Sequence, residues 1–333
     1  MRKSIAWIVW IILIIGMLVT GCGNVTQESV LNDLQSIEKN LKTYKSKAMM
    51  TVQTSEIPQK YYIETWYQSP SLYRIALGDE KRVITQVIVR NNEGIYVINP
   101  QLKKSFRFKG EWAENQGHVY LYHAMIHQIL EAKEKTFKQD EGTVSFDIPI
   151  KENPLIVHQK IVLAERKLDP RQVLLFDKSD KAIVNVTYEE FKTGVKFADD
   201  DFTPEKVMAL ADPKNALPAM THKNDFGIIE PAYVPKGFER QDTIESDASV
   251  LLRYSGDKGA FTLKETRSSS QNQTLVGGNQ LLDLFGAPAI VTGAGNAKTV
   301  YWSRNGVEFA LTGSLPVQEM MKIAASTIDA TGK

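Results

Sequence analysis

His123, His127 and Glu131 are spaced four residues apart, a pattern that could hold a metal ion. On a helix this spacing puts all three side chains on one face, and two histidines one turn apart often begin a zinc site. The zinc-protease pattern, however, needs a glutamate directly after the first histidine, and Ala124 stands there instead. The three side chains also lie opposite the apolar side of the same helix. We therefore favour an exposed polar helix face and expect no metal and no cofactor.

Two further patterns could do chemistry, and each has a simpler interpretation. Asp199, Asp200 and Asp201 could bind calcium, but no EF-hand spacing follows, which favours an acidic strand end or turn. The segment VTGAGNAKT, residues 291–299, lacks the third glycine of a dinucleotide loop, and Lys298 is wrongly spaced for a phosphate-binding loop. No G-x-S-x-G nucleophile turn occurs in the sequence. These patterns predict that the protein is not an enzyme.

Cys22 is the single cysteine of the chain, and its surroundings suggest a lipid anchor. Arg2 and Lys3 precede an apolar run, and small residues then lead to the cysteine, as in a secretory signal. The run is shorter than the ~20 apolar residues that a transmembrane helix needs. The sequence Val19-Thr20-Gly21-Cys22 resembles the lipobox of bacterial lipoproteins. That resemblance implies cleavage before Cys22 and a diacylglycerol on its sulfur, which would place the chain on the extracytoplasmic face of the cell membrane.

Length and charge limit the classes of partner. The 333 residues carry a formal net charge of only +1, without a basic block, so we expect no nucleic-acid binding. After removal of residues 1–21 the length suits two domains. We predict a signal peptide over 1–21, a lipidated tether over 22–29, a first domain over 30–204, a linker over 205–225 and a small α+β domain over 226–333.

Periodicity predicts the elements of the first domain. Apolar residues three and four apart indicate a helix that begins at Val30 and extends through Tyr44 to Ala48. Short strands with turn signals follow, with one more helix at roughly 115–135. Strands this close in sequence favour antiparallel hairpins, because parallel pairs need long crossovers. The fold class we predict is α+β: a highly curved antiparallel sheet, or half-open barrel, covered by helices.

The second domain has fewer clear elements. Strands are indicated by SVLLRYSG, AFTLKET, TVYWSRNG and VEFALTG, all after residue 248. A terminal helix follows, and its apolar face carries Val317, Met320, Met321, Ala324 and Ile328.

Short motifs give the first domain a family likeness. YQSPSLYRIAL is similar to the aromatic-x-x-Pro-x-x-x-Arg strand pair of the LolA/LolB/RseB superfamily of bacterial envelope proteins, with Tyr67, Pro70 and Arg74 in the motif positions. VRNNEGIYVINPQLKKSFRF and DDDFTPE are similar to its hairpin and to its closing stretch. The two-domain arrangement resembles the GerS-like or YdcC-like sporulation and germination lipoproteins of endospore formers.

The resemblance implies a concave apolar surface that holds acyl chains or presents a partner-binding face. The residues we assign to that surface are Tyr62, Trp66, Tyr73, Ile75, Leu77, Val89, Tyr122 and Ile126. An alternative remains open, in which helices simply cover the second face of the sheet. The expected partners are the membrane, an acyl chain or lipoprotein, and an envelope protein. The alternative function is a regulatory scaffold that binds a cell-wall hydrolase or signalling protein without a lipid.

Overall fold

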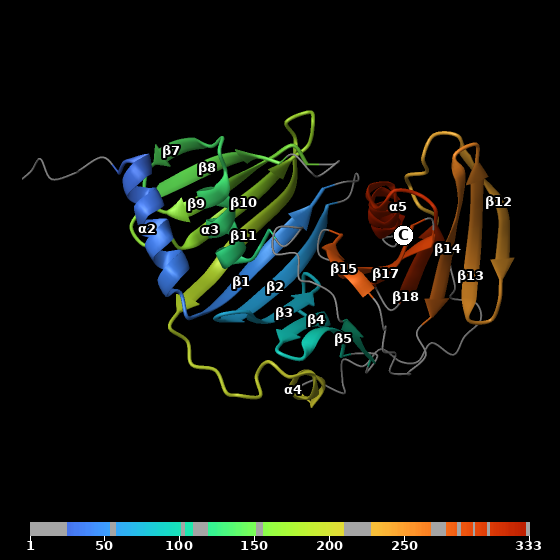
Figure 1. Cartoon of the computed structure of the whole chain (residues 1–333), viewed down its shortest axis with the longest axis horizontal. Helices are drawn as coiled ribbons and strands as arrows, with labels where there is room; N and C mark the ends of the chain where they lie inside the picture. Colours follow the sequence, from blue (N-terminus) through green and yellow to red (C-terminus); the bar gives the residue numbers. More distant parts are fainter. Residues whose placement is uncertain are drawn as a thin grey trace, which may run out of the picture.

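A computed structural model describes residues 25–53, 58–100, 104–108, 119–150, 156–209, 228–267, 278–284, 288–295, 297–304 and 307–330 (Figure 1). The expected signal peptide and Cys22 lie outside these residues. The same holds for most of the expected linker and for the first part of the helix expected at 115–135.

Two antiparallel sheets make up the described chain. The first contains β1 (Thr43–Val52), β2 (Gln59–Gln68), β3 (Leu72–Gly78), β4 (Ile84–Asn91), β5 (Gly94–Asn99), β6 (Lys104–Phe108), β7 (Thr136–Asp140), β8 (Thr143–Pro149), β9 (His158–Ala164), β10 (Pro170–Phe176) and β11 (Ala182–Thr193). Its helices are α2 (Gln27–Asn40), α3 (Tyr122–Glu131) and α4 (Pro204–Ala209).

The first sheet consists of two meanders joined at their centre. The strand order is β6-β5-β4-β3-β2-β1-β11-β10-β9-β8-β7, so β1 pairs with β11, far away in sequence. Strands β6 and β7 end the order, and α3 lies between them in the chain. The sheet is therefore open, and the predicted class of a curved antiparallel sheet with helical cover is confirmed.

Helix α2 differs from its prediction at both ends. It begins at Gln27, inside the expected tether, because Thr26 and Ser29 form a capping box in which each side chain accepts a hydrogen bond from the other's backbone N–H. It ends at Asn40, because the backbone of the following residue, Leu41, is extended. Tyr44 and Ala48, predicted on the helix, lie on strand β1 instead.

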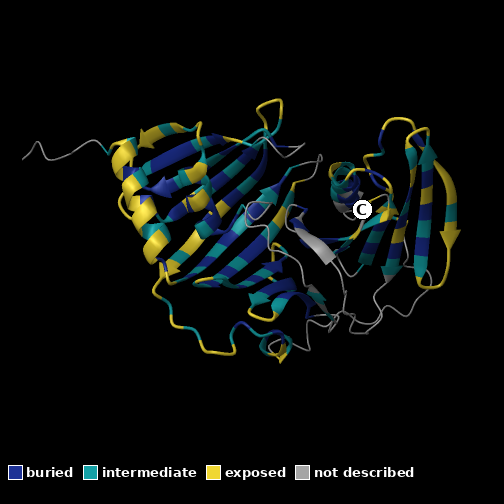
Figure 2. Cartoon of the chain, in the orientation of Figure 1, coloured by how far each residue is buried: buried dark blue, intermediate teal, exposed yellow. Residues whose placement is uncertain are grey.

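The two faces of the first sheet are covered differently. The inner face carries Tyr73, Ile75 and Leu77 and is covered by α2 and α3 (Figures 1 and 2). These three side chains form one buried cluster with apolar side chains of the two helices. The outer face carries a smaller cluster of Val87, Val89, Tyr96 and Ile98, against which α4 packs through Val207.

The second sheet contains β12 (Phe238–Glu245), β13 (Ser249–Gly256), β14 (Gly259–Arg267), β15 (Gly278–Asp283), β16 (Pro288–Ala294), β17 (Ala297–Arg304) and β18 (Val307–Gly313), in the order β12-β13-β14-β18-β17-β16-β15. Strands β12, β15 and β16 were not predicted. The terminal helix was predicted correctly: α5 (Val317–Ala330) buries Met320, Ile323 and Ala324 against one face of the sheet. We call this the helix face of the second sheet.

A buried carboxylate lies on that helix face. Glu265 of β14 is fully buried, and its two oxygens accept the backbone N–H of Ile229 at 3.1 and 3.2 Å. Burial raises the pKa of Glu265 to about 7, although the Ile229 N–H lowers it. The contact fixes the chain just before the second sheet begins.

We expect Glu265→Gln to stabilise the protein at pH 8 by up to about 3 kcal/mol. The pKa is raised in the folded state, so wild-type stability falls as pH rises from about 4.5 to 7 and stays low above that. The side-chain amide of this variant can still accept the hydrogen bond from the Ile229 N–H, and it carries no charge. Urea unfolding at pH 5 and pH 8 measures the gain, which should largely disappear at pH 5.

Glu64→Gln is the matched control. Burial alone would raise the pKa of Glu64, but hydrogen bonds from Lys45 and Trp66 outweigh it and lower the pKa. This substitution should therefore destabilise the protein at pH 8. Equal effects of the two substitutions would contradict the assignment of a buried, penalised charge to Glu265.

Candidate functional site

Five of the eight residues assigned to the concave surface lie together on the inner side of the first sheet. Tyr73, Ile75 and Leu77 come from β3, and Tyr122 and Ile126 come from α3. Each is at most 2% exposed, and all belong to the buried cluster that α2 and α3 complete. Helices therefore cover these side chains.

The other three residues, Tyr62, Trp66 and Val89, lie on the outer face, which corrects our assignment. Successive side chains of a strand alternate between faces, and the register pairs Trp66 with Arg74 and Arg74 with Val89. Arg74 lies between Tyr73 and Ile75 in β3 and so points away from the inner face. Runs that are apolar on both faces misled the prediction because both faces are covered.

Trp66 is the centre of an outer-face cluster. Its ring stacks on Phe197 at 5.2 Å between centroids, and the Lys45 ammonium and Arg74 guanidinium each lie 4.5 Å from its centroid. Its Nε1–H donates to Glu64 at 2.6 Å. These contacts fix the segment after β11 on the sheet and give Trp66 a structural role.

The histidines considered for zinc contact other parts of the fold. His127 Nδ1 lies 3.0 Å from Glu38 Oε1 and links α3 to α2. His123 stacks on Tyr67 at 5.7 Å between centroids. No group of three or more His, Cys, Asp or Glu side chains suited to a metal ion occurs in the described part of the chain.

The acidic triplet forms a turn, as predicted. The Asp201 carboxylate accepts the Ala198 N–H at 2.9 Å, and Asp200 pairs with Lys206 of α4 at 2.8 Å. This pairing lowers the pKa of Asp200. The aspartates thus stabilise the approach to α4.

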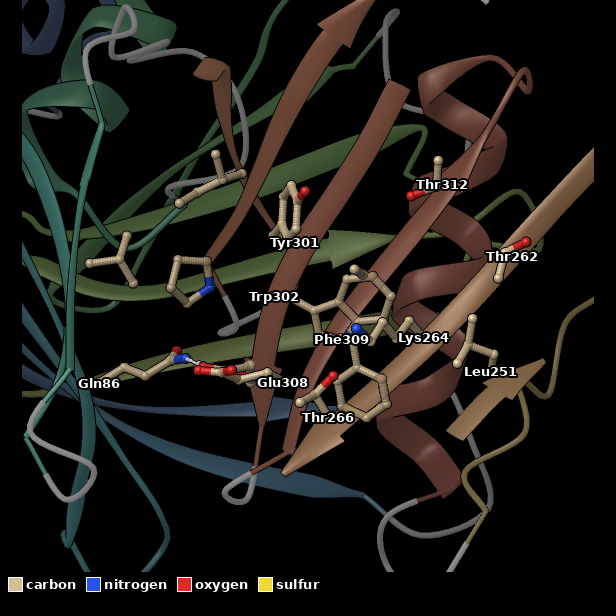
Figure 3. A pocket seen from close by; sticks show the side chains of 15 residues that line it. Gln86, Leu251, Thr262, Lys264, Thr266, Tyr301, Trp302, Glu308, Phe309 and Thr312 are labelled. Carbon is tan, nitrogen blue, oxygen red and sulfur yellow. Dashed lines mark hydrogen bonds between the residues drawn. The ribbon is translucent and has the colours of Figure 1, made fainter. Parts of the chain in front are cut away.

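A pocket of about 510 Å³ lies where the two sheets meet (Figure 3). The first sheet contributes Gln86 of β4 and Val97 of β5. From the second sheet come Leu251, Thr262, Lys264, Thr266, Pro288, Ile290, Tyr301, Trp302, Ser303, Glu308, Phe309, Ala310 and Thr312. This size is ordinary for a small-molecule site, and the lining mixes apolar surface with a few polar groups.

The two sheets share apolar packing beside the pocket. Ile290 is 4% exposed and belongs to the buried cluster of the first sheet, against which Tyr301 also packs. Ile290 and Tyr301 are cross-strand partners, so they point to the same side. We call this side, opposite the helix face, the facing side of the second sheet. It covers the inner face near β4 and β5, beyond the helices.

A polar contact between Gln86 and Ser303 joins the two sheets directly. The Gln86 amide, in a residue only 5% exposed, donates to the Ser303 carbonyl at 3.0 Å and lies 2.5 Å from the Ser303 hydroxyl. A buried amide left unpaired costs about 1–3 kcal/mol, so this bond specifies how the sheets fit together.

Trp302 has an unpaired donor on the helix face of the second sheet, because it pairs with Phe309 and alternates with Tyr301 along β17. The residue is 4% exposed and its ring stacks on Phe309 at 5.0 Å, but its Nε1–H has no hydrogen-bond partner in the described structure. Indole nitrogen is a donor only, so an acceptor must come from water or a ligand. Figure 3 draws Trp302 with the residues around the pocket.

Sequence reasoning missed this pocket. One weak signal was present: β17 alternates Val300 and Trp302 with Tyr301 and Ser303, so both of its faces carry side chains that need cover. Nothing in the sequence indicated that Gln86 lies opposite Ser303.

Comparison with known families gives two matches. Residues 1–202 match the family described as "Sporulation protein YdcC-like", and residues 228–326 match a domain of unknown function, DUF4367. The sporulation protein YdcC of Bacillus subtilis is 28% identical over 339 residues, covering 98% of this chain and 97% of that protein.

Two solved structures show weaker likeness. The MucA/MucB complex of Pseudomonas aeruginosa matches with a TM-score of 0.35 and 11% identity, over 90% of this chain and 98% of that chain. The CwlD amidase of Clostridioides difficile in complex with the GerS lipoprotein matches with a TM-score of 0.30 and 19% identity, over 53% of this chain and 98% of that chain. Both TM-scores are low.

We expect Gln86→Leu to loosen the contact between the sheets and to cost about 1–3 kcal/mol of stability. It removes both hydrogen bonds to Ser303 and leaves the Ser303 groups unpaired. Hydrogen exchange should become faster in β16 and β17. Gln172→Leu is the control, because it removes a Gln–Asn185 bond of 2.9 Å within the first sheet. Unchanged exchange in β17 of Gln86→Leu would contradict the expected coupling.

Proposed function

Because the chain belongs to the YdcC-like family of sporulation proteins, we propose that it is a membrane-anchored lipoprotein that binds rather than catalyses. It would act on the extracytoplasmic side of the cell membrane, in sporulation or germination. Its binding target would be a lipid or lipoprotein, or an envelope protein.

The anchor in this proposal is the Cys22 sulfur. A basic start, an apolar run and the Val19-Thr20-Gly21-Cys22 sequence support it. One acyl chain binds a membrane only weakly, and two or more hold a protein there stably. None of the described helices has both the length and the apolar character that crossing a bilayer requires.

The observation that carries the binding proposal is the pocket between the sheets. It has the size of a ligand site, and both sheets supply its walls. The residues whose spacing could have supported catalysis instead make structural contacts, such as His127 with Glu38 and Asp200 with Lys206. This use of the polar residues supports a binding role over an enzymatic one.

A scaffold without a lipid ligand is the second candidate, and one observation favours it. The five inner-face residues assigned to a lipid surface are at most 2% exposed, with helices over them. In that case the outer surface of the chain would bind the partner, such as a cell-wall hydrolase or a signalling protein.

We expect Cys22→Ala to abolish incorporation of radiolabelled fatty acid and to move the protein out of the membrane fraction. The substitution removes the only thiol that can carry the lipid. Labelling of growing cells followed by fractionation measures both effects. A variant that labels and fractionates like wild type would contradict the proposed anchor.

Purification of residues 23–333 should separate the two binding candidates. The described structure begins at Val25, so removing residues 1–22 deletes none of its contacts. Native mass spectrometry that shows a copurified lipid supports the lipid candidate. An empty protein that captures one envelope protein in crosslinked sporulating cells supports the scaffold. A protein that carries no lipid and captures no envelope protein would contradict the binding proposal.

A further inference from the structure

The facing side of the second sheet carries an apolar row that crosses its strands. The register places six side chains opposite one another on neighbouring strands: Ile244, Leu251, Lys264, Ala310, Tyr301 and Ile290. Only Lys264 in this row is charged, and its apolar stem can cover the row while its ammonium reaches water. Ile290 is buried beside the first sheet, whereas Ile244, at the other end, is 39% exposed. The row therefore leads from the open edge of the sheet to the pocket at the junction.

Hydroxyl side chains lie on both sides of this apolar row. The next row on one side contains a threonine from each of four strands: Thr262, Thr312, Thr299 and Thr292. The row on the other side contains Thr266, Glu308 and Ser303. The wall of the pocket therefore combines the apolar row with hydroxyls from both sides, as Figure 3 shows for Tyr301, Thr262 and Thr266. This surface is a narrow apolar strip between two polar edges.

Several polar groups of this surface have capacity for a ligand. Within the described part of the chain, the hydroxyls of Thr262 and Thr266 and the ammonium of Lys264 form no hydrogen bond or ion pair with another residue. The hydroxyl oxygens of Thr312 and Thr299 lie 3.0 Å apart and share one hydrogen bond, so each can form another. A hydroxyl both donates and accepts, and it is best matched by ligand groups that also do both.

The charges on the facing side balance one another. Lys264 of β14 and Glu308 of the adjacent strand β18 carry opposite charges on the pocket wall. Nearer the edge of the sheet, Arg253 lies 4.0 Å from the Asp242 carboxylate. The surface therefore favours a neutral ligand over a charged polymer.

This pattern suits an oligosaccharide better than a peptide or an acyl chain. An extended peptide pairs with the edge of a sheet, but β14, β18 and β17 are interior strands with a neighbour on each side. An acyl chain would use the apolar row and leave the hydroxyls without a ligand partner. A pyranose ring carries C–H groups on its faces and hydroxyls around its rim. A flat chain of such rings thus presents an apolar face between two polar edges.

The length of the strip limits the length of the ligand. From Leu251 on β13 to Tyr301 on β17 the row crosses three strand spacings, or about 14 Å. Gln86 and Val97 of the first sheet close the far end at the pocket. A short oligosaccharide, or the end of a longer one, fits this space.

We propose that the facing side of the second sheet binds a neutral, flat oligosaccharide, whose ring faces lie on Leu251, Ala310 and Tyr301 and whose hydroxyls bond to Thr262 and Thr266. The end of the sugar chain occupies the pocket at the sheet junction. This inference goes beyond the proposed function, because its target is neither a lipid nor a protein, and each can hold without the other.

The test measures the binding of tetrasaccharides to residues 23–333 by isothermal titration calorimetry. Cellotetraose and chitotetraose are flat β-1,4-linked chains that differ in their N-acetyl groups, and at least one should bind. Maltotetraose has the same glucose units as cellotetraose in a bent α-1,4-linked chain and should bind more weakly than the flat probes.

Thr262→Val and Thr266→Val test the polar edges. Each keeps the β-branched shape and removes one hydroxyl, so each should weaken binding of the flat probe by about 5-fold. Thr243→Val is the matched control. It makes the same change in the same sheet, but Thr243 pairs with Leu252 and so lies on the helix face, and affinity should not change.

Tyr301→Leu tests the apolar strip. It keeps an apolar side chain to pack against the first sheet and removes the ring, so it should weaken binding by about 5-fold or more. Circular dichroism and thermal unfolding establish that each variant is folded. The two threonine variants remain decisive if Tyr301→Leu does not fold.

Two results would overturn the inference. A wild-type protein that binds neither flat probe has no such site. Binding that is unchanged in both threonine variants would place the sugar elsewhere. Equal affinity for maltotetraose would overturn the preference for a flat chain. None of these results bears on the proposed function, which the copurified lipid or the captured envelope protein decides.

Discussion

The pairing of β1 with β11 is the contact on which the architecture depends. It joins strands separated by most of the first domain, and its register runs from Tyr44 opposite Thr193 to Val52 opposite Val184. Without it the chain would be two separate meanders, each with an exposed edge. Because the pairing joins both meanders into one sheet, α3, placed between β6 and β7 in the chain, lies over the inner face.

The same arrangement explains where the second sheet lies. Helices α2 and α3 cover one part of the inner face. Gln86 and Val97, near the β4–β5 end of that face, are left for another element of the chain to cover. Ile290 and Tyr301 supply that cover from the facing side of the second sheet. The junction is thus partly a hydrophobic core and partly a cavity, so the two sheets are coupled by packing and by the amide contact of Gln86 with Ser303.

The sequence was sufficient for the class of fold, the terminal helix and the family, since the match to YdcC-like proteins confirms the resemblance. The prediction of elements failed where one spacing of apolar residues fits both a helix and a strand. Tyr44 and Ala48 are four residues apart, which suits both a helix and a strand, and only the polar Lys45 and Lys47 between them indicate the strand. Strand β12 was missed because it is an exposed edge strand with few apolar residues. The sheet junction could not be predicted, because no local pattern encodes how two sheets pack.

The capping box at Thr26 has a consequence for orientation. Helix α2 starts so close to Cys22 that, on the proposed anchoring, an extended chain between Cys22 and Gln27 spans at most about 18 Å. The amino-terminal end of α2 would then lie near the lipid headgroups and could not swing far from them. A target in the bilayer or at its surface would be within reach, whereas one deep in the cell wall would have to come to the protein.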